Sequence, residues 1–100
     1  MGEYNCTALH WAADKGNEAV AAQLLQANAS VNVENNNGST PLHYAAANGK
    51  AQVVDLLLQA KASPTAVDKD GYTPAQYAEQ YDHPDLAARL RQAEQAASSM

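Results

Sequence analysis

Three histidines and one cysteine are the residues of this sequence whose chemistry could hold a metal ion. His10 and His43 stand 33 residues apart in similar surroundings, whereas His83 falls at a different phase of that spacing. Packed helices lie about 8–10 Å apart, so imidazoles on two neighbouring helices are too distant to share one ion comfortably. Neither a cysteine nor a carboxylate completes a tetrahedral set at a familiar spacing. We therefore predict no metal site and expect His10 and His43 to hydrogen-bond backbone groups of an adjoining loop.

Other catalytic and ion-binding patterns are incomplete as well. Cys6 and His10 could form a nucleophile–base pair, but no third group that would orient them accompanies them. Asp68 and Asp70 lack the further ligands and the distal glutamate of a calcium-binding loop, so we interpret both as solvated loop residues. The five glycines are isolated, which leaves no phosphate-binding loop. The sequence thus predicts a protein that is not an enzyme and that needs no cofactor.

The elements that carry these residues repeat along the chain. The segment TALHWAA at residues 7–13 recurs as TPLHYAA at residues 40–46, and a weaker third copy, TPAQYA, begins at Thr73. Between residues 7–39 and 40–72, 14 of the 33 positions are identical. Such a unit cannot bury its apolar face alone, so the units must stack on one another.

Each unit is predicted to form a helix, a turn, a second helix and a loop. Thr40 and Thr73 precede prolines, and a threonine cap followed by proline is typical of a helix start. Gly16 and Gly49 end a first helix of about eight residues in a left-handed conformation. The second helix of unit two presents one apolar face, formed by Val53, Val54, Leu57 and Leu58. Residues 30–39 and 63–72 are polar, turn-forming connections.

The third unit differs where a terminal unit should. Arg89 and Arg91 replace Leu56 and Leu58 of unit two, which puts charge where no further unit needs an apolar surface. We interpret residues 73–97 as a C-terminal cap.

Charge and composition exclude other classes of protein. The 100 residues suffice for one domain with one core, and 22 of the 46 apolar residues are alanine, which favours short, closely packed helices. A net charge of −5 disfavours a nucleic-acid partner. No apolar run approaches a membrane span, and the N-terminus lacks a signal segment. A single cysteine cannot form an internal disulfide, so we expect a cytoplasmic protein.

The repeated residues resemble the ankyrin repeat. The family pattern of Thr-Pro-Leu-His, an Ala-Ala pair and a glycine is matched by Thr40, Pro41, Leu42, His43, Ala45, Ala46 and Gly49. The resemblance implies one all-α domain over residues 1–100, an ankyrin-repeat solenoid of helix-turn-helix units joined by β-hairpin-like loops. It places repeats at about residues 5–37 and 38–70 and a capping repeat at about residues 71–97. Asn28 and Lys61 stand where the family has glycine, so we expect a strained turn at Lys61.

The resemblance also implies a binding scaffold that uses its loop tips and the exposed, concave side of its first helices. Transferred to this sequence, these positions and the recurring aromatic residues give the predicted partner-binding set: Tyr4, Trp11, Asp14, Lys15, Asn36, Asn37, Ser39, Tyr44, Asn48, Lys69, Asp70, Tyr72, Tyr77, Gln80 and Tyr81. Cys6, Glu34 and Ala47 stand at comparable positions. Trp11, Tyr44 and Tyr77 recur every 33 residues and should align as a ladder, which serves packing between units, partner binding, or both.

Two functions fit this interpretation. The first is an intracellular, non-enzymatic adapter or scaffold, a monomer that binds a neutral or modestly basic partner protein and neither nucleic acid nor membrane. The alternative is a targeting or regulatory ankyrin segment of a larger enzyme or channel. Asn32 resembles the asparagine that ankyrin repeats offer to asparaginyl hydroxylases, and its amide either pins the loop or accepts that modification.

Overall fold

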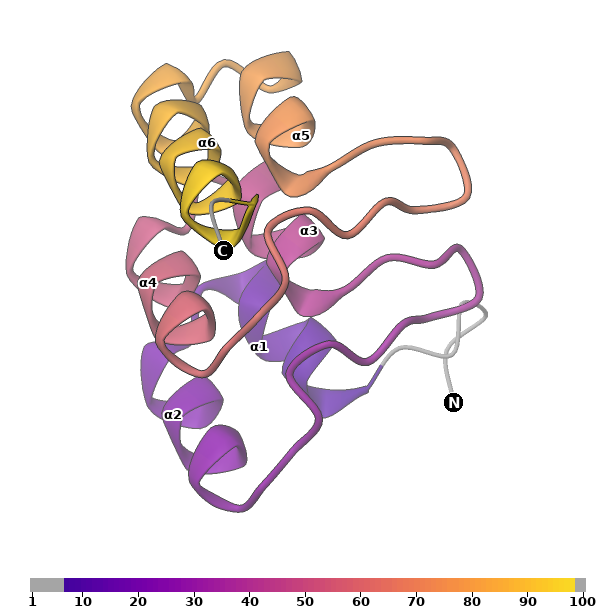
Figure 1. Cartoon of the computed structure of the whole chain (residues 1–100). Coiled ribbons are helices and arrows are strands. Elements are labelled where there is room, and N and C mark those ends of the chain that lie inside the picture. The colour runs from indigo at the N-terminus through magenta and orange to yellow at the C-terminus, as the bar shows by residue number, and fades with distance from the viewer. Residues whose placement is uncertain (1–6, 99–100) are drawn as a thin grey trace.

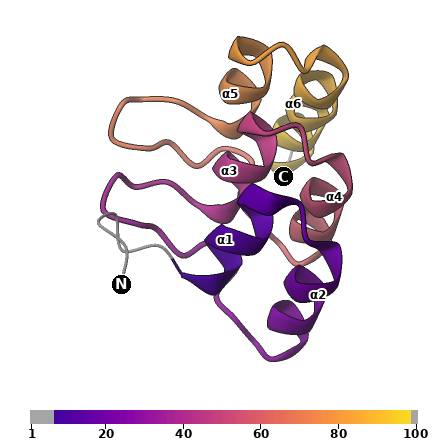
Figure 2. The ribbon, with the colours of Figure 1, turned by 180° about the vertical axis from the view of Figure 1, so that it is seen from behind.

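The computed structural model describes residues 7–98 and shows three stacked helix pairs in that part of the chain (Figure 1). The first helices of the pairs form one layer and the second helices form another, with the long loops projecting from the layer of first helices (Figures 1 and 2). The helices are α1 (Ala8–Lys15), α2 (Glu18–Gln26), α3 (Pro41–Ala47), α4 (Ala51–Gln59), α5 (Pro74–Gln80) and α6 (Pro84–Ser98). No strand occurs among these residues, and none of the six helices is long and apolar enough to cross a membrane.

The first helix of each unit begins at a threonine, as predicted. Thr40 accepts a hydrogen bond from the His43 N–H, while the His43 ring accepts one from the Thr40 N–H, which is a complete capping box. Thr7 and His10 repeat this arrangement in α1. In the third unit Gln76 replaces the histidine, and its side-chain oxygen accepts from the Thr73 N–H at 2.8 Å. A glutamine therefore preserves the cap.

The first helices stop at residues with left-handed backbone. Gly16 and Gly49 have φ of 71° and 69°, which confirms the predicted stops, and Asp82 takes the equivalent place in unit three with φ of 68°. Gly49 is also closely covered, because a Cβ added there would lie 2.6 Å from the His83 ring. Lys61 has φ of 76°, so the turn expected to be strained is indeed left-handed at a non-glycine residue.

Small side chains allow the helices to pack closely. Leu42, Leu57 and Leu90 are fully buried, and most of the remaining core is alanine. Unit one is less covered than unit two, since Val20 is 38 % exposed whereas the equivalent Val53 is 1 % exposed. The apolar face of α2 therefore lacks the neighbour that the same face of α4 has.

Two exposed ion pairs are formed by arginines of the last unit. Arg91 of α6 contacts Glu79 of α5 at 2.6 Å, and Arg89 contacts Asp55 of α4 at 3.0 Å. The arginines that replace leucines in this unit thus lie near the surface, and one of them reaches back to the preceding pair of helices. Exposed pairs of this kind contribute little stability each.

Candidate functional site

One histidine in each of the first two units bonds to the loop that leads into the next unit. The Nε2 atoms of His10 and His43 lie 2.8 Å and 2.9 Å from the backbone oxygens of Ser39 and Tyr72. Each Nδ1 accepts a backbone N–H from the capping threonine at 3.0 Å. Because a carbonyl only accepts and an N–H only donates, the ring must be neutral with its proton on Nε2. The expected role of these histidines, bonding to backbone groups of an adjoining loop, is confirmed.

Electrostatics keep these imidazoles neutral. Burial lowers the pKa of both His10 and His43, and the hydrogen bond that each ring makes to a loop carbonyl opposes this effect only partly. Across the residues described, no group of three or more His, Cys, Asp or Glu side chains lies close enough together to hold a metal ion.

Asp68 organises the loop between α4 and α5. One carboxylate oxygen accepts the backbone N–H groups of Asp70 and Tyr72, both at 3.0 Å, and the other accepts the hydroxyl of Tyr77. Asp68 is only 5 % exposed, so the expectation that it is a solvated loop residue was wrong, whereas Asp70 is exposed as expected. The loop folds back over the carboxylate because that group replaces water as the acceptor for two turn N–H groups.

The pKa of Asp68 reflects this balance. Burial raises the pKa, but the hydrogen bonds from the Tyr77 hydroxyl and the Tyr72 backbone outweigh it, so the pKa lies below its ordinary value. Burial and the bond to Asp68 together raise the pKa of Tyr77, which keeps its hydroxyl protonated as a donor.

Asn35 performs the same task in the preceding loop. Its side-chain oxygen accepts the N–H groups of Asn37 and Ser39 at 2.9 Å and 3.0 Å, and its amide donates to the Tyr44 hydroxyl at 2.7 Å. The buried, loop-organising role of Asn35 and Asp68 was not predicted, although the sequence contains a signal for it. An Asn or Asp followed three residues later by glycine, as at 35–38 and 68–71, is typical of a type I turn.

The recurring tyrosines pack against histidines of the preceding unit. The Tyr44 ring meets His10 edge-on at a centroid distance of 5.4 Å, and Tyr77 meets His43 in the same way at 5.7 Å. Tyr44 and Tyr77 therefore serve packing between units, which is one of the two roles predicted for the recurring aromatic residues. Trp11, which precedes them in the series, is 56 % exposed, with the Lys15 ammonium 6.0 Å from its ring.

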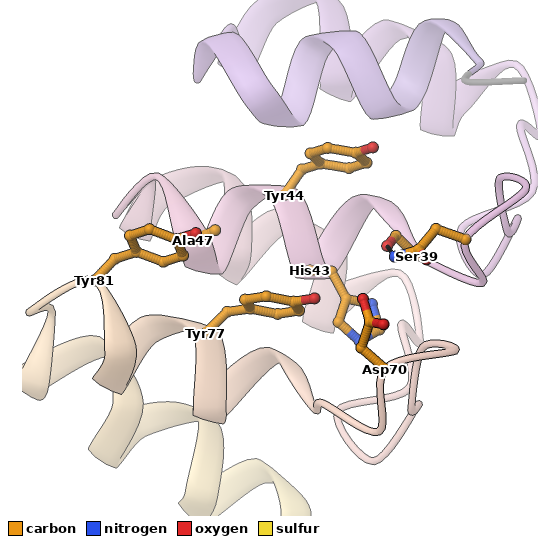
Figure 3. Close-up of a pocket in the computed structure, with 8 residues that line it drawn as sticks. Ser39, His43, Tyr44, Ala47, Asp70, Tyr77 and Tyr81 are labelled. Carbon is orange, nitrogen blue, oxygen red and sulfur yellow. Dashed lines mark hydrogen bonds between the residues drawn. The ribbon is translucent and has the colours of Figure 1, made fainter. Parts of the chain in front are cut away.

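An open cavity of about 400 Å³ lies between α3, α5 and the two loops (Figure 3). We call it the tyrosine groove, and it is lined by Asn37, Ser39, His43, Tyr44, Ala47, Asp70, Tyr77 and Tyr81. The rings of Tyr77 and Tyr81 are nearly parallel, with an interplanar angle of 17° and centroids 6.4 Å apart. Tyr72 packs beside them, 5.3 Å from Tyr77. Three tyrosine rings thus form one continuous aromatic surface on units two and three.

The tyrosine groove brings together part of the predicted binding set. Six predicted residues line it: Asn37, Ser39, Tyr44, Asp70, Tyr77 and Tyr81. Tyr72 is adjacent, and the Lys69 N–H donates to the Asn37 carbonyl at 2.9 Å, which ties the two loop tips together. His43 also lines the groove, in addition to the structural role predicted for it.

The other predicted positions lie elsewhere. Asp14 and Asn48 bond to each other at the ends of α1 and α3, with the Asn48 amide 2.6 Å from the Asp14 carboxylate. Trp11 and Lys15 lie on α1, and Asn36 and Gln80 are exposed outside the groove lining. Tyr4 and Cys6 lie outside the described residues. Asn32 bonds to the Lys61 carbonyl at 3.3 Å and accepts the Ser63 N–H at 2.8 Å, so its amide does pin the next loop.

A family model described as ankyrin repeats (three copies) matches residues 9–98, which covers all six helices apart from the first residue of α1. A search of curated proteins finds no match.

Proposed function

We propose that this chain, which belongs to the ankyrin-repeat family, binds a partner protein through the tyrosine groove and the two loop tips beside it. Ankyrin repeats are in general protein–protein interaction modules without catalytic activity of their own. The finer assignment, an adapter that uses this particular surface, is supported by the geometry of the groove.

The observation that carries the proposal is a pair of fixed, partly buried aromatic rings beside two exposed ones. The Tyr77 hydroxyl is held by Asp68 and the Tyr44 hydroxyl by Asn35, so both rings are positioned before any partner arrives. Tyr72 and Tyr81 are 39 % and 54 % exposed. Tyrosines of this kind offer a large contact area and lose little conformational freedom on binding.

The size of the groove indicates how a partner would engage it. A volume of about 400 Å³ lies near the lower end of the range for ligand pockets, so it accepts a few side chains of a partner rather than a whole domain. The loop tips would add contacts around this central point. With so small a footprint we expect an affinity in the micromolar range.

The test is affinity capture of a partner from a lysate of the chain's own organism. We would immobilise the unaltered chain and the double variant Tyr72→Ala/Tyr81→Ala. The backbone hydrogen bonds of both tyrosines are kept in this variant. The Tyr72 carbonyl still accepts from His43, and the N–H of residue 81 still donates to the Tyr77 carbonyl. The double variant should therefore retain its helical circular dichroism while it loses the partner.

A matched control changes two exposed residues on the opposite layer, Gln23→Ala on α2 and Gln52→Ala on α4. The control should capture the same protein as the unaltered chain. Equal capture by the tyrosine variant and the control would remove the groove from the binding surface. Loss of capture by the control alone would show that binding depends on the second helices instead.

A further inference from the structure

We propose that the tyrosine groove binds the side chain of an arginine presented by the partner, an inference that rests on the proposed function and specifies its partner chemistry. Two features of the groove carry it: flat aromatic surface and one carboxylate without a counter-ion.

The aromatic surface suits a flat cation. Tyr77 and Tyr81 present nearly parallel rings, and Tyr44 lines the same cavity from α3 (Figure 3). A guanidinium group is planar and weakly hydrated, so it stacks on tyrosine faces and is attracted by their π electrons. An ammonium group has the charge but not the plane, and it loses more hydration on entering such a site.

The charge of the groove is negative and uncompensated. Asp70 is its charged lining residue, and it lies at the hydroxyl end of Tyr77 in Figure 3. His43, the basic residue in the lining, is neutral because its Nδ1 accepts the Thr40 N–H. Lys69 adjoins Asp70 in sequence but does not line the cavity.

Two acidic residues elsewhere in the described structure show what pairing with an arginine looks like. Asp55 and Glu79 each pair with an arginine of α6, at 3.0 Å and 2.6 Å. No described cation forms such a pair with Asp70. A partner arginine stacked on the tyrosines would place its N–H groups near this carboxylate, which is the geometry of a charge-assisted hydrogen bond.

Other side chains satisfy the groove less well. An aliphatic residue would cover the rings but would desolvate Asp70 without giving it a partner. An acidic residue would meet a like charge. Lysine has the charge and is attracted by the rings, but it has no planar group that stacks on them and it loses more hydration. Arginine is the one common side chain that matches both the aromatic faces and the carboxylate.

The test uses four blocked pentapeptides, acetyl-Gly-Gly-X-Gly-Gly-amide, in which X is arginine, lysine, citrulline or norleucine. Citrulline has nearly the shape of arginine without its charge. Each peptide is titrated at low salt into the ¹⁵N,¹³C-labelled full chain and followed by nuclear magnetic resonance. We expect the arginine peptide to shift the ring signals of Tyr77 and Tyr81 and to bind about threefold to tenfold more tightly than the citrulline peptide.

Variants separate charge from shape. Asp70→Asn should reduce the advantage of the arginine peptide over the citrulline peptide and leave only the attraction by the tyrosine rings, whereas Glu18→Gln, which changes the net charge equally on distant α2, should leave that advantage unchanged. Equal binding of arginine and citrulline, or equal effects of the two variants, would overturn the inference. So would the absence of any shift in the groove. The lysate capture judges the proposed function separately, because it makes no assumption about which residue the partner inserts.

Discussion

Removal of the Asp68 carboxylate should destabilise the fold far more than removal of its charge. Asp68→Ala leaves two backbone N–H groups of the loop and the Tyr77 hydroxyl without their acceptor. Hydrogen bonds to a charged acceptor contribute about 1.5–3 kcal/mol each, and part of this is recovered when water reaches the loop. We therefore expect a loss of about 2–4 kcal/mol.

Asp68→Asn is the matched control, because unit two already contains the asparagine version of this loop. Asn35 accepts two loop N–H groups through its oxygen and donates to Tyr44 through its amide. An asparagine at position 68 can make the same three bonds, which become neutral and weaker. The expected loss is about 1 kcal/mol at neutral pH.

The pH dependence follows from the lowered pKa of Asp68. The folded protein binds this proton less readily than the unfolded chain does, so stability from the carboxylate is present above its ordinary pKa of 3.8 and is lost as the pH falls through the folded value. The advantage of the unaltered chain over Asp68→Asn should therefore disappear in acid.

The assay is thermal unfolding followed by circular dichroism, at neutral pH and in steps from about pH 5 downwards. For a domain of this size, a loss of about 1 kcal/mol lowers the Tm by roughly 4–8 °C. The Tm of Asp68→Ala should therefore be about 10–25 °C lower than that of the unaltered chain. Equal losses for the alanine and asparagine variants would refute the reasoning, since the charge and not the bonding pattern would then be responsible. A loss below about 1 kcal/mol for Asp68→Ala would refute it as well.

Three further predictions concern stability measured by urea unfolding. Gly49→Ala should lower the free energy of unfolding by about 2–3 kcal/mol, because the residue has a positive φ and its new Cβ would collide with the imidazole of His83. In the control Gly71→Ala the Cβ meets nothing within 4 Å, so the loss should be about 1 kcal/mol. Equal losses for the two variants would contradict the collision. Val53→Ala should cost about 2 kcal/mol and the equivalent Val20→Ala less than about 1 kcal/mol, in line with their burial. The pKa of His43 is lowered from 6.5, so the unfolded chain takes up a proton first and stability falls as the pH drops below that value. His43→Gln should make this decline shallower between pH 7 and 5, and an unchanged slope would contradict it.

The helices could be predicted from the sequence because their signals are local. A threonine cap, a proline at the first helical position and a left-handed stop such as Gly49 each act within a few residues. The left-handed turn at Lys61 could also be anticipated, although from the resemblance and not from lysine itself. These features do not depend on how the units stack.

The interior of the loops could not be predicted in the same way. Asp68 and Asp70 are both short, acidic loop residues, yet one is buried and the other exposed. The difference arises because the turn closes over Asp68 and Tyr77 arrives from the next helix, nine residues later. Burial of this kind depends on contacts between elements, which composition does not reveal.

The sequence predicted several residues that line the groove, but it did not predict which of the equivalent positions would come together. Tyr77, Tyr81 and Asp70 do share one groove, because stacking brings α3, α5 and both loops together. Asp14 and Asn48, chosen by the same criterion, instead bond to each other. The period of the sequence gives equivalent positions in each unit but does not show which of them have a neighbouring unit.

The uneven burial of equivalent valines implies that the stack does not open evenly. Within residues 7–98, unit one contacts one other unit and its α2 face is partly exposed, so α1 and α2 should unfold locally at a lower free energy than the rest of the described structure. The tyrosine groove is built from residues 37–81, but Ser39 and Tyr44 of its lining contact His10, so this opening would loosen the side of the groove next to α1 and leave the side formed by α5 in place. A bound partner should therefore slow amide hydrogen exchange most in α3 and α5, less in α1 and least in α2. In a repeat protein of this kind, the midpoint of global melting and the integrity of the binding surface are separate quantities.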